Sequence, residues 1–211
     1  MIHSKRGSLR RVALSGAVLA SASMIGVLAS PTLASAGSMK TSKTTFTLNC
    51  DTGIANGQVT VKTTQKYPKS VAAGASFAIQ WKSETIVGGA LGEAAYTLAP
   101  GGSEKGTITT DDDLSTDATP STSNVAGAGL NEEGTIKAST FPVYTPPKKT
   151  SPKYFTTPDF TAGSAGTDTV SAGDDDATVT IYNKSGGVVT TTTADCTPAG
   201  TPAVIATIKV T

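Results

Sequence analysis

The sequence predicts an all-β protein built as an antiparallel β-sandwich of about eight or nine strands. Threonine and valine are abundant along the chain, and both favour the pleated surface of a strand. Short runs alternate between apolar and polar residues, which is the period of a strand with one buried face. The 22 glycines and 11 prolines punctuate these runs at turn positions. We therefore expect two packed sheets with Greek-key connections.

Residues 1–36 have the composition of a signal peptide. Basic residues, among them Arg10 and Arg11, precede an apolar stretch, and Ala34 and Ala36 fit the A-x-A pattern of a cleavage site. Serines and a glycine interrupt that stretch, so we expect cleavage after Ala36 and no stable membrane span afterwards. The paired arginines resemble a twin-arginine signal, although the general secretory route is favoured. The mature protein is expected outside the cell or at its surface.

The mature chain is expected to comprise a short linker, residues 37–43, and a single domain, residues 44–211. All arginines and the one histidine precede residue 37, which leaves 13 lysines against 16 acidic residues and a net charge of −3. Nucleic-acid binding needs a basic, arginine-rich surface that this composition lacks. The same balance argues against strong electrostatic binding to anionic membranes.

Strands of the N-terminal half are predicted from alternating apolar residues in 44–50 and 57–68. Phe77, Ile79 and Trp81 alternate in the next run, so Trp81 is expected in the core. Residues 84–98 repeat apolar residues at helical spacing, which predicts a short helix despite its glycines. The other apolar positions of these segments are Phe46, Leu48, Cys50, Val59, Val61, Leu91, Ala94, Ala95 and Leu98.

The C-terminal half is predicted to contain further strands and one clear hairpin, which turns at residues 183–187. Residues 109–124 are rich in Thr, Ser, Gly and Asp, which is typical of a long surface loop. The last strand is expected to bury alternate residues from Val204 to Val210. The apolar residues that mark these strands are Ile108, Ile136, Phe141, Val179, Ile181, Val204, Ala206, Ile208 and Val210.

The only two cysteines, Cys50 and Cys196, lie near opposite ends of the predicted domain. In an exported protein an even number of cysteines favours pairing. The alternatives are two free thiols or a catalytic cysteine. A nucleophilic cysteine needs a base, usually histidine, and residues 37–211 contain none. We therefore predict a structural disulfide between Cys50 and Cys196.

Two acidic stretches are candidates for a weak calcium site, because Ca²⁺ prefers several carboxylate oxygens. Asp111 and Asp113 match the first ligand positions of an EF-hand loop, but this sequence lacks the glycine and the final acidic residue of that loop. Asp174 and Asp176 belong to the second stretch, which is typical of a turn between strands. Solvated loops are the favoured interpretation, with neither a metal nor another cofactor, and calcium binding is the alternative.

No catalytic constellation emerges from the sequence, so a non-enzymatic protein is expected. A Ser-His-Asp triad and histidine-ligated zinc both need histidine. No glycine-rich phosphate loop with a lysine is present. A carboxylate-dependent hydrolase acting on carbohydrate is the alternative, although nothing in the sequence brings two glutamates together. The candidates for such a pair are Glu84, Glu93, Glu132 and Glu133.

Aromatic residues flank the lysine- and proline-rich segment TPPKKTSPK, residues 145–153. They form either an exposed contact surface or a hydrophobic cover that pins the loop, and the second interpretation is favoured. The residues concerned are Tyr144, Tyr154, Phe155 and Phe160.

Three motifs carry a resemblance to uncharacterised secreted actinobacterial proteins with an immunoglobulin-like β-sandwich domain. They are FTLNC after the leader, YPKSVAAGASFAIQW, and DCTPAG before the terminal strand. The resemblance covers the layout of residues 46–211 and implies an immunoglobulin-like fold with paired Cys50 and Cys196, but no activity. We therefore expect a secreted or envelope-associated protein with a binding, adhesion or structural role. Its partner would be a protein or an envelope component; the sequence specifies neither ligand nor oligomeric state.

Overall fold

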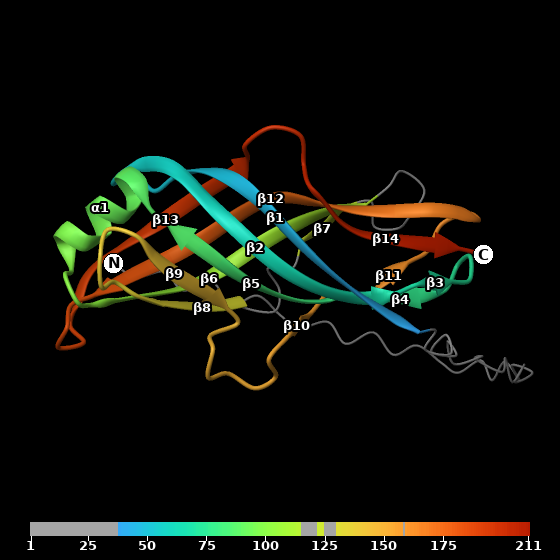
Figure 1. The fold of residues 1–211 in the computed structure, drawn as a ribbon, viewed down its shortest axis with the longest axis horizontal. Helices are drawn as coiled ribbons and strands as arrows, with labels where there is room; N and C mark the ends of the chain where they lie inside the picture. The colour runs from blue at the N-terminus through green and yellow to red at the C-terminus, as the bar shows by residue number, and fades with distance from the viewer. Residues whose placement is uncertain (1–37, 115–121, 125–129, 158) are drawn as a thin grey trace, which may run out of the picture. The chain divides into compact units, whose positions relative to one another are not determined.

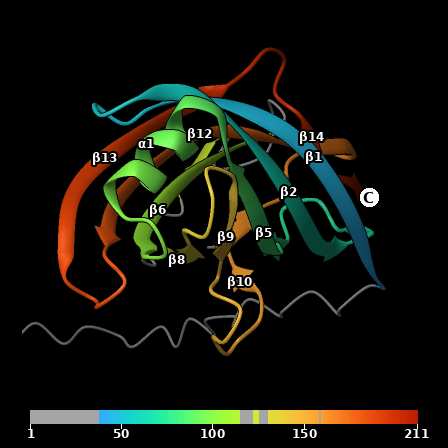
Figure 2. The ribbon, with the colours of Figure 1, turned by 60° about the vertical axis from the view of Figure 1, so that its left-hand side comes forward.

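Eight antiparallel strands close into a barrel in the computed structural model, which describes residues 38–114, 122–124, 130–157 and 159–211. Each strand pairs with the next, and the last pairs with the first (Figures 1 and 2). In sheet order they are β12 (Gly166–Tyr182), β13 (Val188–Pro198), β1 (Met39–Asp51), β2 (Asn56–Pro68), β5 (Gln80–Val87), β9 (Phe141–Thr145), β8 (Leu130–Thr135) and β6 (Ser103–Leu114).

The all-β class is confirmed, whereas the expected immunoglobulin-like sandwich is not. The 17-residue strand β12 pairs with β13 on one side and with β6 on the other, so the sheet continues without a break around the ring. A sandwich would need two sheets that face one another across a core. Alternation of apolar and polar residues is the same in both folds, because one face of every strand is buried in each.

Apolar side chains from short strands fill the end of the barrel opposite helix α1 (Gly89–Leu98). Strand β14 (Val204–Val210) pairs with the first part of β12 and, in parallel, with β3 (Ser70–Val71). Figure 1 shows these strands gathered at the right, with β4 (Ser76–Phe77) and β11 (Phe160–Thr161), and α1 at the left. The largest fully buried members of this cluster are Phe160, Ile79, Ile208 and Val170.

Several expected boundaries differ from those observed. Strand β1 begins at Met39, inside the expected linker, and β6 continues to Leu114, inside the expected loop 109–124. The run that contains Phe77, Ile79 and Trp81 is split between β4 and β5, although all three side chains are buried. Two small strands complete the sheet: β7 (Thr122–Asn124) pairs with β6, and β10 (Phe155–Thr156) pairs with β5.

The acidic stretch at residues 174–176 is not the turn that the sequence predicts. It lies within β12, where the pairing with β6 shifts register between Ala172 and Asp175. A β-bulge of this kind accommodates residues that favour turns without ending the strand. The last strand also differs in detail, because Val204 is exposed and the adjacent Ile205 is buried. Residues 1–36, with the predicted signal peptide and its cleavage position Ala36, lie outside the described residues.

Two local predictions are confirmed, the hairpin and the helix. Strands β12 and β13 pair across the turn at residues 183–187, where Asn183 accepts a backbone hydrogen bond from Gly187. Helix α1 covers the interior near that end of the barrel (Figure 2). A Cβ atom on Gly92 would lie 1.9 Å from the carbonyl oxygen of Ser139, so only glycine permits this approach. Among the described residues, no helix is long and apolar enough to cross a membrane.

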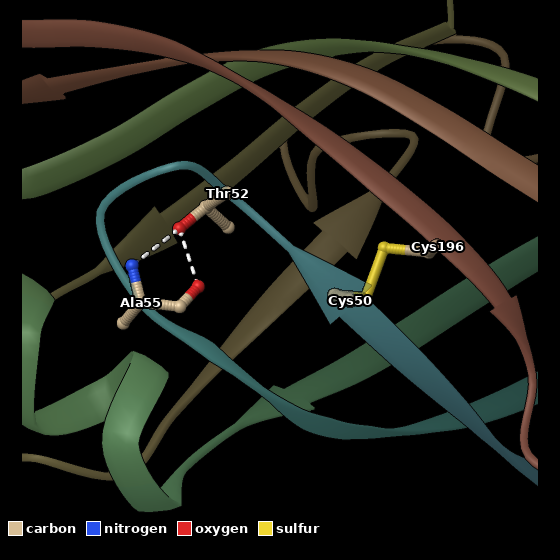
Figure 3. Close-up of a disulfide and its surroundings, with 4 residues drawn as sticks. All are labelled: Cys50, Thr52, Ala55 and Cys196. Carbon is tan, nitrogen blue, oxygen red and sulfur yellow. Dashed lines mark hydrogen bonds between the residues drawn. A yellow bond between two sulfur atoms is a disulfide. The ribbon is translucent and has the colours of Figure 1, made fainter.

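The predicted disulfide joins Cys50 of β1 to Cys196 of β13 (Figure 3). The two residues lie opposite one another in the antiparallel ladder, with Cα atoms 4.1 Å apart and 146 positions apart in sequence. This ladder contains only four residue pairs, from Leu48 opposite Pro198 to Asp51 opposite Asp195. The disulfide therefore reinforces a short seam that completes the ring of strands.

We expect the Cys50→Ala/Cys196→Ala variant to lose about 3 to 5 kcal/mol of unfolding free energy, because a long loop in the unfolded chain is released. Thermal unfolding of both proteins measures the loss. Reduced wild-type protein is the matched control and should melt near the variant. Alkylation followed by intact-mass measurement should modify neither cysteine until the protein is reduced. Free thiols in the unreduced protein would contradict the pairing.

Candidate functional site

A cavity of about 110 Å³ lies inside the barrel and is walled mainly by apolar side chains. The walls come from β1, β2, β5, β12, β13 and α1, which converge because each strand turns alternate residues inward. An eight-stranded barrel is just wide enough to be filled by its own side chains or to hold one small ligand. The principal apolar contributors are Leu48, Val59, Val61, Leu91, Val179 and Ile181.

The cavity reaches the surface beside α1 and the turn between β1 and β2. Ile54 in the turn and Leu98 in the helix both line the cavity, and they are 45% and 39% exposed. The Thr52 hydroxyl holds the turn, donating to the Ala55 carbonyl at 2.8 Å and accepting the Ala55 N–H at 3.1 Å (Figure 3). Thr192 of β13 donates to the Thr52 carbonyl. The rim is therefore apolar and fixed to the barrel wall.

Two glutamates, Glu104 and Glu132, line the cavity from the neighbouring strands β6 and β8. Both side chains are buried, at 8% and 7% exposure. Glu132 lies opposite Gly106 in the ladder, and a Cβ atom on that glycine would come within 2.5 Å of the Glu132 Oε1. The missing side chain at Gly106 thus leaves room inside the barrel for the Glu132 carboxyl group.

Burial shifts the titration of both carboxyl groups. Desolvation raises the pKa of Glu104 to about 7. Desolvation, with smaller contributions from the negative charges of Glu104 and Asp175, raises the pKa of Glu132 to about 8. The neutral forms are favoured because an apolar interior solvates a carboxylate poorly.

No basic side chain lines this cavity among the residues that the structure describes. Neither Glu104 nor Glu132 has a hydrogen-bond or ion-pair partner in that part of the chain. Asp175 of β12 adds a third acidic group to the wall. Buried acidic groups normally have such partners, so a partnerless pair inside a cavity is a candidate for ligand contact.

A smaller cavity of about 40 Å³ adjoins the first and shares Val61, Thr85, Ile108 and Asp175 with its walls. Trp81 also lines it and packs edge-on against Phe155 of β10, so it lies in the core as predicted. Its indole N–H is buried without a hydrogen-bond partner among the described residues. The interior of the barrel thus contains both apolar space and unsatisfied polar groups.

The four glutamates expected as catalytic candidates are not brought together. Glu132 enters the cavity, whereas the neighbouring Glu133 faces outward and forms an exposed ion pair with Lys105 at 3.7 Å. Glu93 is exposed on α1, and Glu84 lies on the outer face of β5. The partner of Glu132 is instead Glu104, which the sequence-based selection missed. The signal was present, because period-2 alternation places Glu104 on the same face as Ile108.

The calcium candidates lie on two paired strands. Asp174 and Asp176 are exposed in β12, and Asp111 and Asp113 belong to β6, which pairs with β12. The side chains of Asp111 and Asp113 lie outside the description. Among the described residues, no group of three or more His, Cys, Asp or Glu side chains is arranged to hold a metal ion. Calcium binding at these residues stays a prediction.

We expect wild-type protein to become more stable as pH falls from 8.5 to 5.5. The folded-state pKa values of Glu104 and Glu132 lie above the ordinary glutamate value of about 4.5, so the folded state binds more protons between these limits. This stabilisation is complete below about pH 4.5 and is lost as pH rises through 7 and 8.

The Glu104→Gln/Glu132→Gln variant has neutral side chains at both positions, so it buries no negative charge there at high pH. At pH 8.5 its unfolding free energy should exceed that of wild type by about 1 to 3 kcal/mol. Melting temperatures measured across the pH range should show a flatter profile for this variant. Exposed Glu93 and Glu133 provide the matched Glu93→Gln/Glu133→Gln control, which should follow wild type. Identical profiles for wild type and the buried-pair variant would contradict the raised pKa values.

Comparisons of the chain with protein-family models, curated proteins and solved structures gave no match. The resemblance to secreted immunoglobulin-like proteins therefore stays a prediction, and the candidate site depends on its own geometry.

Proposed function

We propose that this is an exported, non-enzymatic binding protein whose barrel holds a small, largely apolar ligand carrying a basic amino group. The observation that supports this most strongly is the pair formed by Glu104 and Glu132, buried in an apolar cavity that has no basic lining residue among those described. An ammonium group would supply the missing opposite charge.

The size of the cavity limits the ligand. An apolar cavity of about 150 Å³ is known to hold benzene, so about 110 Å³ suits a ligand of roughly the same number of heavy atoms or slightly fewer. A longer apolar tail can extend through the rim between Ile54 and Leu98, whose exposed side chains would cover it. The amino group would then lie inside and the tail toward solvent.

Charge complementarity determines the preferred chemistry. A buried carboxylate without a partner is costly and avoids that cost by taking up a proton. A cation within about 4 to 6 Å lowers the pKa of a carboxyl group, so a bound ammonium group favours ionised Glu104 and Glu132. Binding near neutral pH should therefore release protons to solvent, which a neutral ligand would not cause.

Location outside the cytoplasm agrees with the Cys50–Cys196 disulfide, because such bonds persist in oxidising compartments. The signal-peptide composition of residues 1–36 supports export independently. We therefore place the binding role outside the cell or at the envelope. An immunoglobulin-like relationship and an actinobacterial origin stay hypotheses that depend on the three sequence motifs.

Hydrolysis of carbohydrate fits the site less well than binding does. A glycosidase needs one ionised carboxylate beside one carboxylic acid, positioned on either side of a sugar ring. Here both pKa values are raised, and both groups lie in a mainly apolar cavity of about 110 Å³. A calcium-dependent module likewise has no support beyond the two acidic stretches.

Isothermal titration calorimetry with n-hexylamine, hexan-1-ol and hexanoate at pH 7.5 tests the proposal. The three probes have similar tails and differ in the charge of the head group. We expect the amine to bind at least ten times more tightly than the alcohol, which corresponds to about 1.4 kcal/mol, and hexanoate not to bind. Titrations in two buffers with different ionisation enthalpies should detect proton release with the amine alone.

Glu104→Gln/Glu132→Gln should bind the amine no more tightly than the alcohol, because the apolar walls remain but no longer offer the two carboxylates that offset desolvation of the ammonium group. Glu93→Gln/Glu133→Gln is the matched control and should keep the preference of wild type. Equal binding of the amine and the alcohol by wild type would refute the assigned ligand class. A preference that survives in the buried-pair variant, or no binding of any probe, would equally count against the site.

A further inference from the structure

A groove of about 540 Å³ lies on the outer face of the barrel over β1, β2 and β5. The loop that follows β9 forms its other wall through Pro146 and Pro147. In the described part of the chain, five lysines and one carboxylate, that of Glu84, line this groove. The lysines are Lys43, Lys62, Lys82, Lys148 and Lys153, and we call this surface the lysine groove.

Strand register places the lysines on a common face. Lys43 of β1 pairs with Thr64 of β2, which pairs in turn with Lys82 of β5. Lys62 pairs with Thr45 on one side and with Glu84 on the other. Because strands are about 4.8 Å apart, this arrangement forms a grid in which the lysines alternate with Thr45, Thr64 and Glu84.

Two tyrosine rings contact lysine ammonium groups in and beside the lysine groove. The Lys148 Nζ lies 3.9 Å from the centre of the Tyr144 ring. The Nζ atoms of Lys66 and Lys82 lie 4.2 and 5.2 Å from the centre of the Tyr154 ring. Cation–π contacts of this kind position an ammonium group without neutralising it. Tyr144 and Tyr154 therefore belong to a polar surface, whereas Phe155 and Phe160 pack inward.

Acidic side chains compensate the lysine groove only in part, because Glu84 is the one carboxylate among its described lining residues. None of its five lysines forms an ion pair with a described residue; the one ion pair described joins Lys105 to Glu133 elsewhere. Residues 37–211 carry a net charge of −3, so this local excess of positive charge runs against the balance of the chain. Closely spaced like charges repel one another, and a bound polyanion would relieve that repulsion.

We propose that the lysine groove binds a linear anionic polysaccharide, one that carries carboxylate or phosphate groups along its length. A groove lined by ammonium groups suits a chain of anionic groups, and its threonine hydroxyls offer hydrogen bonds to sugar hydroxyl groups. Nucleic-acid recognition usually relies on arginine, and residues 37–211 contain none. Among the residues described, no exposed large apolar side chain lines the groove to enter a lipid surface. The inference is independent of the ligand proposed for the barrel interior.

Biolayer interferometry with polygalacturonate, with a phosphate-bearing polysaccharide (phosphomannan) and with neutral dextran tests the inference on the purified protein. We expect both anionic polymers to bind and dextran not to bind, with affinity falling steeply between 50 and 300 mM NaCl. Carboxylate and phosphate polymers are compared so that the preferred anion is identified. Single-stranded DNA and vesicles containing anionic lipid are tested as the competing partner classes, at the same concentration of negative charge as the polysaccharides.

The Lys43→Gln/Lys62→Gln/Lys82→Gln variant should bind the anionic polymers at least tenfold more weakly. The matched control, Lys137→Gln/Lys184→Gln/Lys209→Gln, removes three exposed lysines elsewhere and should stay within twofold of wild type. Melting temperature verifies that both variants fold. Equal losses in the two variants would show that net charge alone acts, which overturns the groove. Binding of DNA or of anionic vesicles as tight as that of the polysaccharides would overturn the assigned partner.

Discussion

The pairing of β1 with β13, fixed by the Cys50–Cys196 disulfide, is the constraint on which the closed barrel depends. Seven of the eight strand pairings leave a curved but open sheet, and this short ladder completes the ring. Both cysteines also line the central cavity, so the bond that closes the barrel forms part of its inner wall. Closure is what removes Glu104 and Glu132 from water. Without it, the interior would be the exposed face of an open sheet, and neither raised pKa would have a cause.

Because alternate residues of a strand point to opposite faces, the barrel wall separates acidic side chains inside from lysines outside. Inward positions of β6 and β8 carry carboxyl groups, and outward positions of β1, β2 and β5 carry lysines. A net charge of −3 conceals this division, because it averages an acidic interior and other acidic surfaces with a basic groove. The interior is complementary to a small cation and the groove to a polyanion. A single protein could therefore attach to an anionic matrix while its barrel remains accessible to a ligand.

Local features were predictable from the sequence wherever one short-range rule decided the outcome. Asn183 and the glycines that follow it specify the turn of the β12–β13 hairpin, and helical spacing from Leu91 to Leu98 outweighed the glycines of α1. Gly92 even assists the packing of that helix, since a side chain there would meet Ser139. Closure of the barrel was not predictable, because it depends on register between strands that are distant in sequence. Glu104 was missed for a different reason: a glutamate in a strand is normally assigned to the solvent face, although its spacing from Ile108 places it on the buried face.

The most direct test of the account is a ¹³C NMR titration of the glutamate side-chain carboxyl groups in the oxidised protein, with Glu104→Gln and Glu132→Gln variants to assign the signals. The account predicts two carboxyl groups that titrate near pH 7 and pH 8, and it predicts that both midpoints fall when n-hexylamine is bound. It also predicts that unfolding of the protein moves both midpoints toward ordinary values. Titration of Glu104 and Glu132 near pH 4.5 in the oxidised, ligand-free protein would show that the pair is solvated, and it would contradict both the closed barrel and its proposed ligand.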